Sequence, residues 1–275
     1  MTTLHFTESG TPGKPTLIFL HGLAMGGWMW TDQIASFADY HLLNIEMPGH
    51  GDSHAVPWKS MADTADLVAE VIANHATNGR AHVIGLSLGG LVGLHVLLRH
   101  PHRVERAIIS GSPASEPTPK LMYQLQSRLV GLLLNTPLGV KVFARMLFIP
   151  SEAMEVFTAF IKKLSRPMYW SVVHELMSFV LPPGMSQIAA PTLLVTGEKD
   201  IAFNVESVRT LAAVLPNNVA VLAPQVHHGW NGEAPQLFDA MMRAWIEQKP
   251  LPESMIPIRT GQGSGSELKP APANQ

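Results

Sequence analysis

The sequence contains no cysteine, which excludes disulfide bonds, thiolate metal sites, iron–sulfur clusters and a catalytic thiol. Charged side chains are also sparse, because Asp, Glu, Lys and Arg make up only 15% of the 275 residues. The 19 basic and 21 acidic residues leave a formal net charge of −2, so the chain has no strong positive field that would attract a polyanion. We therefore expect no nucleic-acid partner.

Long hydrophobic runs are missing as well. No uninterrupted apolar stretch reaches the roughly 20 residues that a membrane-spanning helix needs. The N-terminal residues MTTLHFTESGTPGKP lack the basic start and the apolar run of a secretory signal. We expect a cytoplasmic protein without a membrane span, and the sequence makes no prediction about its oligomeric state.

Apolar side chains, in contrast, are plentiful at 46% of the residues, enough for a substantial core in a chain of this length. Short β-rich apolar runs alternate with longer helical patterns, which predicts a largely parallel sheet covered by helices, the α/β class. Each run is nearly continuous in apolar residues, as expected for strands that are buried on both faces. The predicted strands are residues 16–20, 42–47, 81–85, 107–110, 192–196 and 219–222.

The alternation stops after residue 110 and resumes at residue 192. Between these points, residues 114–187 have the pattern of helices broken at prolines, which predicts a helical cap. The cap would interrupt an α/β core made of residues 1–113 and 188–248. From residue 249 onward, five prolines and the stretch Gly-Gln-Gly-Ser-Gly-Ser predict a flexible C-terminal tail, residues 249–275.

The strongest local motif is Gly85-Leu86-Ser87-Leu88-Gly89, between a predicted strand and an apolar helix. A sharp strand-to-helix turn needs small residues around its central residue, and it holds that side chain at the helix N-terminus. Unpaired backbone N–H groups and the helix dipole there favour a developing negative charge. Ser87 is therefore a candidate nucleophile, although a glycine-rich turn without any chemistry would give the same short pattern.

A serine hydroxyl is a poor nucleophile near neutral pH, so this chemistry needs a base and an acid that orients the base. Asp200 and Glu198 follow the predicted strand 192–196 and are competing acids. His227 and His228 come later in the chain and are competing bases. No helical histidine pair with a third carboxylate occurs, so we predict no metal site and no cofactor.

Together these motifs resemble the α/β-hydrolase superfamily, over roughly residues 3–248. His21-Gly22-Leu23 is similar to the HG loop of that family, which implies that the backbone N–H groups of Leu23 and Leu88 form the oxyanion hole. Thr196-Gly197-Glu198-Lys199-Asp200 is similar to the acid loop of the family, which implies that Asp200 is the acid.

The segment that starts at His228 resembles the family ending in which the catalytic histidine stands five residues before a Glu and seven before a Pro, here Glu233 and Pro235. The resemblance thus selects His228, with His227 as the second choice. It also implies an α/β-hydrolase fold: a mostly parallel central sheet flanked by helices, with a helical cap inserted after the sixth strand.

The remaining histidines are expected to have no catalytic role. The resemblance gives His21 a structural place in the oxyanion loop, whereas the patterns around His82 and His95 predict hydrogen-bonded core residues. The turn histidines are expected to be solvated; they are His50, His54, His100 and His102.

The substrate pocket is expected to be apolar. Met25, Trp28 and Trp30 of the oxyanion loop, with Trp230 after His228, are candidate substrate-binding residues, because methionine and aromatic side chains form adaptable apolar pockets. The same residues could instead belong to the protein core.

We predict a carboxylesterase-like serine hydrolase that cleaves a small to medium, largely apolar carboxylic ester or lactone through an acyl-enzyme on Ser87. Carbon–carbon bond hydrolases, perhydrolases and prolyl aminopeptidases of the same superfamily also use a serine, and they remain alternatives. A small-molecule receptor that retains the triad is an alternative of another class, in which apolar cap residues would be partly exposed as an interaction surface.

Overall fold

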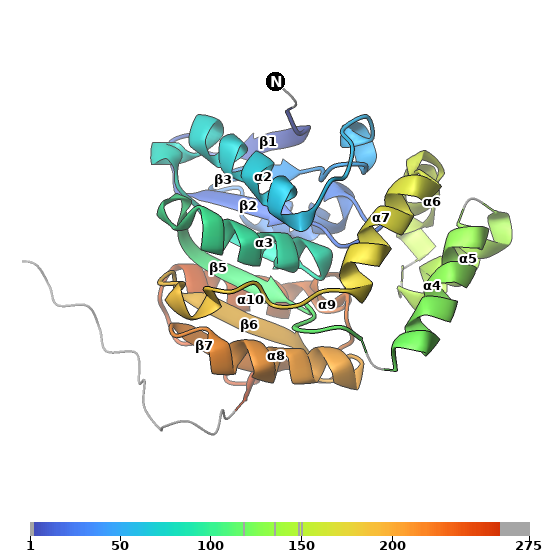
Figure 1. The fold of residues 1–275 in the computed structure, drawn as a ribbon. Coiled ribbons are helices and arrows are strands. Elements are labelled where there is room, and N and C mark those ends of the chain that lie inside the picture. Colours follow the sequence, from blue (N-terminus) through green and yellow to red (C-terminus); the bar gives the residue numbers. More distant parts are fainter. Residues whose placement is uncertain (1–2, 118, 135, 148, 150, 259–275) are drawn as a thin grey trace, which may run out of the picture.

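An eight-stranded sheet lies at the centre of the computed structural model, which describes residues 3–258 except 118, 135, 148 and 150 (Figure 1). The strand order is β1-β3-β2-β4-β5-β6-β7-β8. The strands are β1 (Phe6–Gly10), β2 (Thr16–Leu20), β3 (His41–Ile45), β4 (Ala81–Leu86), β5 (Val104–Ser110), β6 (Thr192–Gly197), β7 (Asn218–Ala223) and β8 (Ile256–Pro257).

Six strands pair in parallel: β3, β2, β4, β5, β6 and β7. The two edge strands pair antiparallel, β1 with β3 and β8 with β7. All six strands expected from the sequence are present, and they are the parallel ones. The sequence analysis missed β1 and β8. Most of β1 is exposed and β8 is two residues long, so neither produces an apolar run.

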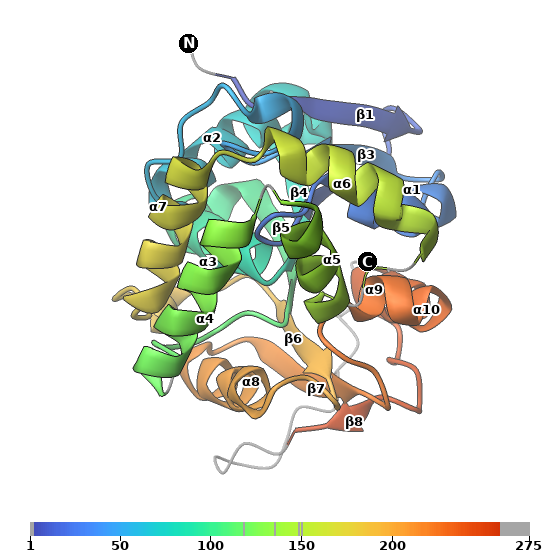
Figure 2. The ribbon, with the colours of Figure 1, turned by 90° about the vertical axis from the view of Figure 1, so that its right-hand side faces the viewer.

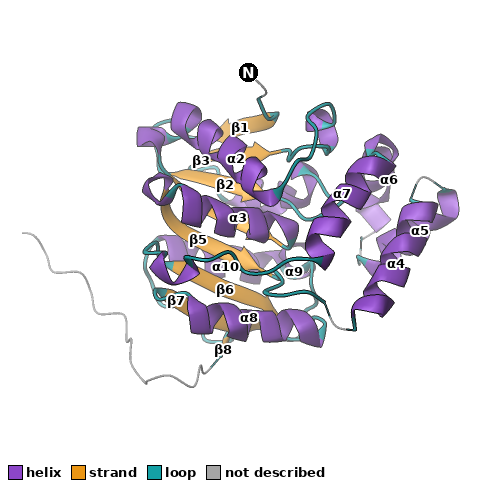
Figure 3. Cartoon of the chain, in the orientation of Figure 1, coloured by secondary structure: helices purple, strands orange, loops and turns teal. Residues whose placement is uncertain are grey.

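Helices cover both faces of the sheet, as Figure 3 shows. Alternate residues of β2 face opposite sides, because Ile18 and Leu20 belong to one core cluster while Leu17 and Phe19 belong to the other. The first cluster includes residues of α2 (Met61–His75), α3 (Leu88–Arg99) and α8 (Ala202–Val214). Near the second lie α1 (Thr31–Ser36), α9 (Trp230–Glu233) and α10 (Pro235–Ile246).

Four further helices lie between β5 and β6 in sequence and stand beside one end of the sheet (Figures 1 and 2). Two of the prolines that predicted breaks begin helices, since Pro137 and Pro167 lie in first turns that are capped by the side chains of Thr136 and Ser165. The helices are α4 (Lys120–Leu133), α5 (Pro137–Met146), α6 (Met154–Lys163) and α7 (Arg166–Met177).

Two details of the sequence prediction need correction. The four helices follow the fifth strand of this sheet, not the sixth, because a single strand, β1, precedes β2. The stretch expected to be flexible from residue 249 is ordered up to residue 258: Met255 is buried and Ile256 pairs with Leu222 of β7. The rest of that stretch, 259–275, lies outside the described residues. Within the described part, no helix has both the length and the apolarity needed to cross a membrane.

Candidate active site

Ser87 occupies the turn between β4 and α3 in a backbone conformation that is rare for a residue with a side chain, with φ 56° and ψ −115°. Two glycines make this turn possible. A Cβ atom at Gly85 would lie 2.4 Å from the carbonyl oxygen of Gly89, and one at Gly89 would lie 2.1 Å from that of Leu20. The motif is therefore required sterically, as its spacing predicted.

The end of β5 holds this turn in place. The backbone N–H of Ser87 donates to the carbonyl oxygen of Ser110 at 2.8 Å, and the hydroxyl of Ser112 donates to the carbonyl oxygen of Ser87 at 2.9 Å. Leu88 is the first residue of α3, so its backbone N–H belongs to the first turn, where N–H groups have no partner within the helix.

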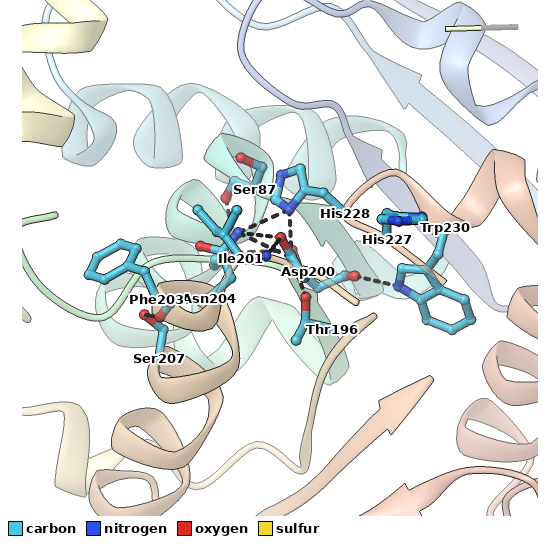
Figure 4. Close-up of polar contacts among 12 residues, drawn as sticks. Ser87, Thr196, Asp200, Ile201, Phe203, Asn204, Ser207, His227, His228 and Trp230 are labelled. Atoms are coloured by element: carbon cyan, nitrogen blue, oxygen red, sulfur yellow. Dashed lines mark hydrogen bonds and ion pairs between the residues drawn. The ribbon is translucent and has the colours of Figure 1, made fainter. Parts of the chain in front are cut away.

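Asp200 and His228 form a hydrogen-bonded pair next to Ser87. Asp200 follows β6, His228 follows β7, and His228 Nδ1 lies 2.8 Å from Asp200 Oδ2. Because a carboxylate only accepts, the Nδ1–H donates and Nε2 is left for a second partner. Figure 4 shows Ser87 and Asp200 on different sides of the His228 ring, with Ser87 beside it.

Three further donors hold the buried Asp200 carboxylate, whose side chain is 2% exposed. Thr196 Oγ1 donates to Oδ2 at 2.5 Å, the backbone N–H of Ile201 donates to Oδ1 at 2.7 Å, and Asn204 Nδ2 reaches both oxygens, at 3.0 and 3.1 Å. Burial by itself would raise the pKa of Asp200, but the bonds from His228, Thr196 and Asn204 outweigh it and lower that pKa. The carboxylate is thus ionised at neutral pH.

The competing residues lie elsewhere. Glu198 accepts hydrogen bonds from the backbone N–H and the side-chain amide of Gln225, at 2.9 and 2.8 Å. His227 contacts Glu233, with its backbone N–H donating to Oε2 at 2.7 Å and its Nδ1 3.0 Å from Oε1. The geometry therefore brings Asp200 and His228 to the serine turn, and not Glu198 or His227.

Two buried histidines shape the loop that carries Leu23. His21 Nδ1–H donates to the carbonyl oxygen of Gly22 at 2.8 Å, and His21 Nε2 accepts the backbone N–H of Met47 at 3.1 Å. His50 Nδ1–H donates to the carbonyl oxygen of Pro48, while its Nε2 accepts the N–H of Ala24, directly after Leu23, at 3.2 Å. These bonds tie the loop to the turn that follows β3.

The prediction that His50 is solvated was wrong, because its side chain is fully buried against His21. Its turn position gave no sign of this, since the partner, Ala24, is far away in sequence. The core prediction holds for the burial of His82, although its Nδ1 has no hydrogen-bond partner within the described residues. His100 is partly buried and contacts Asp66 at 2.7 Å.

These buried histidines predict a loss of stability in mild acid. Burial lowers the pKa of His21 and His82 to about 4 and that of His50 to about 3, below the ordinary value of 6.5. The unfolded chain therefore binds more protons once the pH falls below about 6.5, and each group costs about 1.4 kcal/mol of unfolding free energy per pH unit down to its folded pKa.

Urea unfolding at about pH 7, 6 and 5 measures this slope. His50→Asn removes one titrating group, so we expect a slope that is smaller by about 1.4 kcal/mol per pH unit. His102→Asn, at an exposed position, is the matched control and should leave the slope unchanged. Equal slopes for wild type and His50→Asn would contradict the lowered pKa of His50.

Gly111, directly after β5, is a position beside His228 that the sequence analysis missed. Its φ is +58°, and a Cβ atom there would lie 2.8 Å from His228 Cε1. A side chain at this position would displace the imidazole. The signal in the sequence was a glycine directly after the predicted strand 107–110.

A cavity of about 250 Å³ connects these elements, and both Ser87 and His228 line it. Met25, a candidate substrate-binding residue, and Leu23 line it, joined by residues of α5 and α7. The full set of lining residues is Gly22, Leu23, Met25, Met29, Leu86, Ser87, Phe143, Leu147, Tyr169, Leu176, His228 and Gly229. Burial raises the pKa of Tyr169 to about 12, so its hydroxyl is neutral.

The three tryptophans expected in this pocket are not among its lining residues. Trp28 packs edge-on against Phe157 of α6, at 6.2 Å between ring centroids. Trp30 is fully buried in the core between Phe19 and Phe238. Trp230 is fully buried too, and its indole N–H donates to Ser110 Oγ at 3.0 Å (Figure 4). Trp30 and Trp230 therefore belong to the core cluster on one face of the sheet.

The described part of the chain holds no group of three or more His, Asp or Glu side chains placed to bind a metal ion. The chemistry available at the site comes from a serine hydroxyl at a helix N-terminus, an oriented imidazole and an ionised carboxylate.

Comparison with known proteins identifies the family. A family model described as the alpha/beta hydrolase fold matches residues 15–171. The chain is 28% identical to (E)-2-((N-methylformamido)methylene)succinate hydrolase of Acinetobacter baylyi, over 90% of this chain and 95% of that protein. It is 26% identical to 3-oxoadipate enol-lactonase 2 of the same species, over 89% of this chain and 93% of that protein.

Among solved structures, a hydrolase from Pseudomonas aeruginosa PA01 is similar in fold, with a TM-score of 0.75 and 23% identity, covering 88% of this chain and 94% of that one. The two relatives by sequence are named as a hydrolase and a lactonase, which agrees with an enzyme that acts on ester bonds. Because the family model matches more than half of the sequence, the protein belongs to the alpha/beta hydrolase fold family.

Proposed function

We propose that the protein is a serine hydrolase that cleaves a small, uncharged, largely apolar carboxylic ester or lactone. The observation that carries this proposal is the serine turn itself: Ser87 has a strained backbone, and it lines the same cavity as a histidine whose Nδ1 is bonded to a buried carboxylate. Strain of this kind is retained where it serves a function.

The proposed reaction has two steps. Ser87 Oγ attacks the ester carbonyl carbon while His228 Nε2 takes its proton, and the oxyanion accepts hydrogen bonds from the N–H groups of Leu23 and Leu88. The intermediate collapses, the alcohol leaves with the proton from His228, and an acyl-enzyme remains. A water molecule, deprotonated by His228, then releases the carboxylic acid and restores Ser87. Asp200 keeps the imidazole in the required tautomer throughout.

The cavity lining favours an uncharged substrate. Its described residues include no Lys or Arg, and its hydrocarbon and thioether side chains could not replace the hydration of a carboxylate. The succinate in one relative's name is a dianion, so we expect this chain to differ from that relative in specificity. The volume of about 250 Å³ suits a short acyl chain.

A panel of p-nitrophenyl esters from acetate to dodecanoate tests the proposal. We expect the highest kcat/KM at butyrate to hexanoate, because longer chains exceed the cavity. The matched comparison, followed by acid release, is methyl butyrate against the monomethyl ester of succinate, which has the same chain length and a carboxylate in place of the terminal methyl group. The butyrate should be preferred at least about tenfold, since burying an unpaired charge is costly.

A preference for the succinate monoester would contradict the uncharged pocket. No turnover of any ester, in a folded protein whose Ser87 still reacts with a fluorophosphonate, would instead favour the carbon–carbon bond hydrolases or the receptor.

A further inference from the structure

The outer sides of α4 and α5 carry an unusual concentration of exposed apolar side chains. Seven of the eleven large apolar residues that are exposed in the described part of the chain belong to these two helices. On α4 they are between 51% and 68% exposed, and they are Leu121, Met122, Leu125, Leu129 and Leu132. On α5 they are Leu138 and Val142.

These residues form one continuous stripe on each helix. At about 100° per residue, the five α4 residues fall within an arc of about 100°. On α5, Leu138, Lys141, Val142 and Arg145 share one face and are all exposed. Figure 2 shows α4 and α5 next to each other at the front of the molecule. We call these two stripes together the α4–α5 outer face.

The charged side chains of α4 and α5 are all positive. Residues 117–151 contain no Asp or Glu but include Lys120, Arg128, Lys141 and Arg145. Lys120 pairs with Glu116 at 2.7 Å, before the helix begins. The other three cations have no ion-pair partner among the residues that the structure describes, and all three are exposed. Apolar and cationic side chains side by side are typical of helices that lie on membrane surfaces.

We propose that the α4–α5 outer face binds the surface of a membrane that is rich in anionic lipid. The leucines would enter the boundary between headgroups and acyl chains, and Arg128, Lys141 and Arg145 would contact lipid phosphates. A second copy of this chain fits the charges less well. In a two-fold pair the same face meets itself, so unpaired cations would face unpaired cations.

The inner side of α5 lies next to the cavity, so membrane binding through the α4–α5 outer face would bring the bilayer close to the proposed reaction site. Phe143 lines the cavity that holds Ser87, so a bilayer on the outer side of α5 would lie one helix away from the proposed reaction site. The binding proposal does not depend on the proposed function, because it concerns side chains outside the cavity.

Co-sedimentation of the full chain with vesicles tests the proposal. We expect binding to vesicles of equal parts phosphatidylcholine and phosphatidylglycerol, weak binding to phosphatidylcholine alone, and release by high salt. The double variant Arg128→Gln with Lys141→Gln should weaken binding roughly 25-fold, at about fivefold for each cation. Leu125→Ser should weaken it at least about tenfold.

The controls are matched in exposure and chemistry. Lys14→Gln, between β1 and β2, and Val180→Ser, after α7, change exposed residues outside the face and should leave vesicle binding unchanged. Ser87→Ala should bind as the wild type does, which separates this proposal from the proposed function. Unchanged melting temperatures would show that the variants are folded.

Two results would overturn the proposal. One is the absence of binding to anionic vesicles, or binding that the controls weaken as much as the α4–α5 variants do. The other is a dimer in solution that Leu125→Ser dissociates without any lipid binding, which would make the face a contact between copies.

Discussion

Ser87→Ala is expected to lower kcat for the preferred ester by about 10⁴-fold or more while the protein stays folded. The substitution removes the atom that attacks the carbonyl and leaves both N–H donors of the proposed oxyanion hole in place. Stability should change little, because alanine has the same Cβ atom at φ 56° and the Ser87 hydroxyl makes no capping hydrogen bond to α3 within the described residues. Steady-state kinetics and circular dichroism at matched concentrations measure the two quantities.

The two adjacent histidines supply the control. His228→Ala should cause a loss similar to that of Ser87→Ala, and combining the two should add little, because we propose that both belong to a catalytic triad, whose residues act as one unit. His227→Ala should keep most of the activity, since its ring faces Glu233 instead. Equal inactivity of the His227 and His228 variants would show that the base has been assigned wrongly or that the whole loop has moved.

Asp200→Asn is expected to cost about 10⁴-fold in kcat, a large loss for an exchange of one oxygen for one nitrogen. His228 Nδ1 now donates to the carboxylate at 2.8 Å. An amide N–H in that place would require Nδ1 to accept, so the proton would move to Nε2, the atom that must take the serine proton. The Nδ1 proton itself can be followed by NMR, and it should be lost in the variant.

Glu198→Gln is the matched control, because it makes the same exchange at the neighbouring carboxylate. We expect activity within about twofold of the wild type, since Glu198 contacts Gln225 and not the imidazole. A full loss in the Glu198 variant and a small one in the Asp200 variant would reverse the assignment of the acid.

The inner part of the fold was predictable because its physical cause is local. Strands buried on both faces need apolar runs such as Thr16–Leu20, and such runs are visible in the sequence. The edge strands β1 and β8 have one neighbour each, so their pairing depends on what lies beside them and leaves no local pattern. For the same reason, the ordering of residues 249–258 against β7 could not be foreseen from their prolines.

In the candidate site, too, some residues were predictable from local sequence and others were not. Ser87 was predictable because the two glycines that its turn requires, Gly85 and Gly89, stand two residues before and after it, so their spacing is visible in the sequence. The roles of His50 and Gly111 depend on contacts with Ala24 and His228, far away in sequence, and no spacing reveals them. Trp30 and Trp230 were assigned to the pocket on residue type alone, but burial in the core uses the same residue types.

The pairing of β5 with β6 has a consequence for how this protein can diversify. Ile108 and Leu193 are register partners, although the whole helical stretch α4 to α7 separates them along the chain. That stretch leaves and re-enters the sheet at neighbouring strands, so it can be lengthened, shortened or exchanged as one block. Ser87, Asp200 and His228 are all encoded outside it. Selection can therefore change the part of the cavity lining that α5 and α7 contribute by replacing one contiguous piece of the gene, and the three residues that we propose as catalytic are inherited intact.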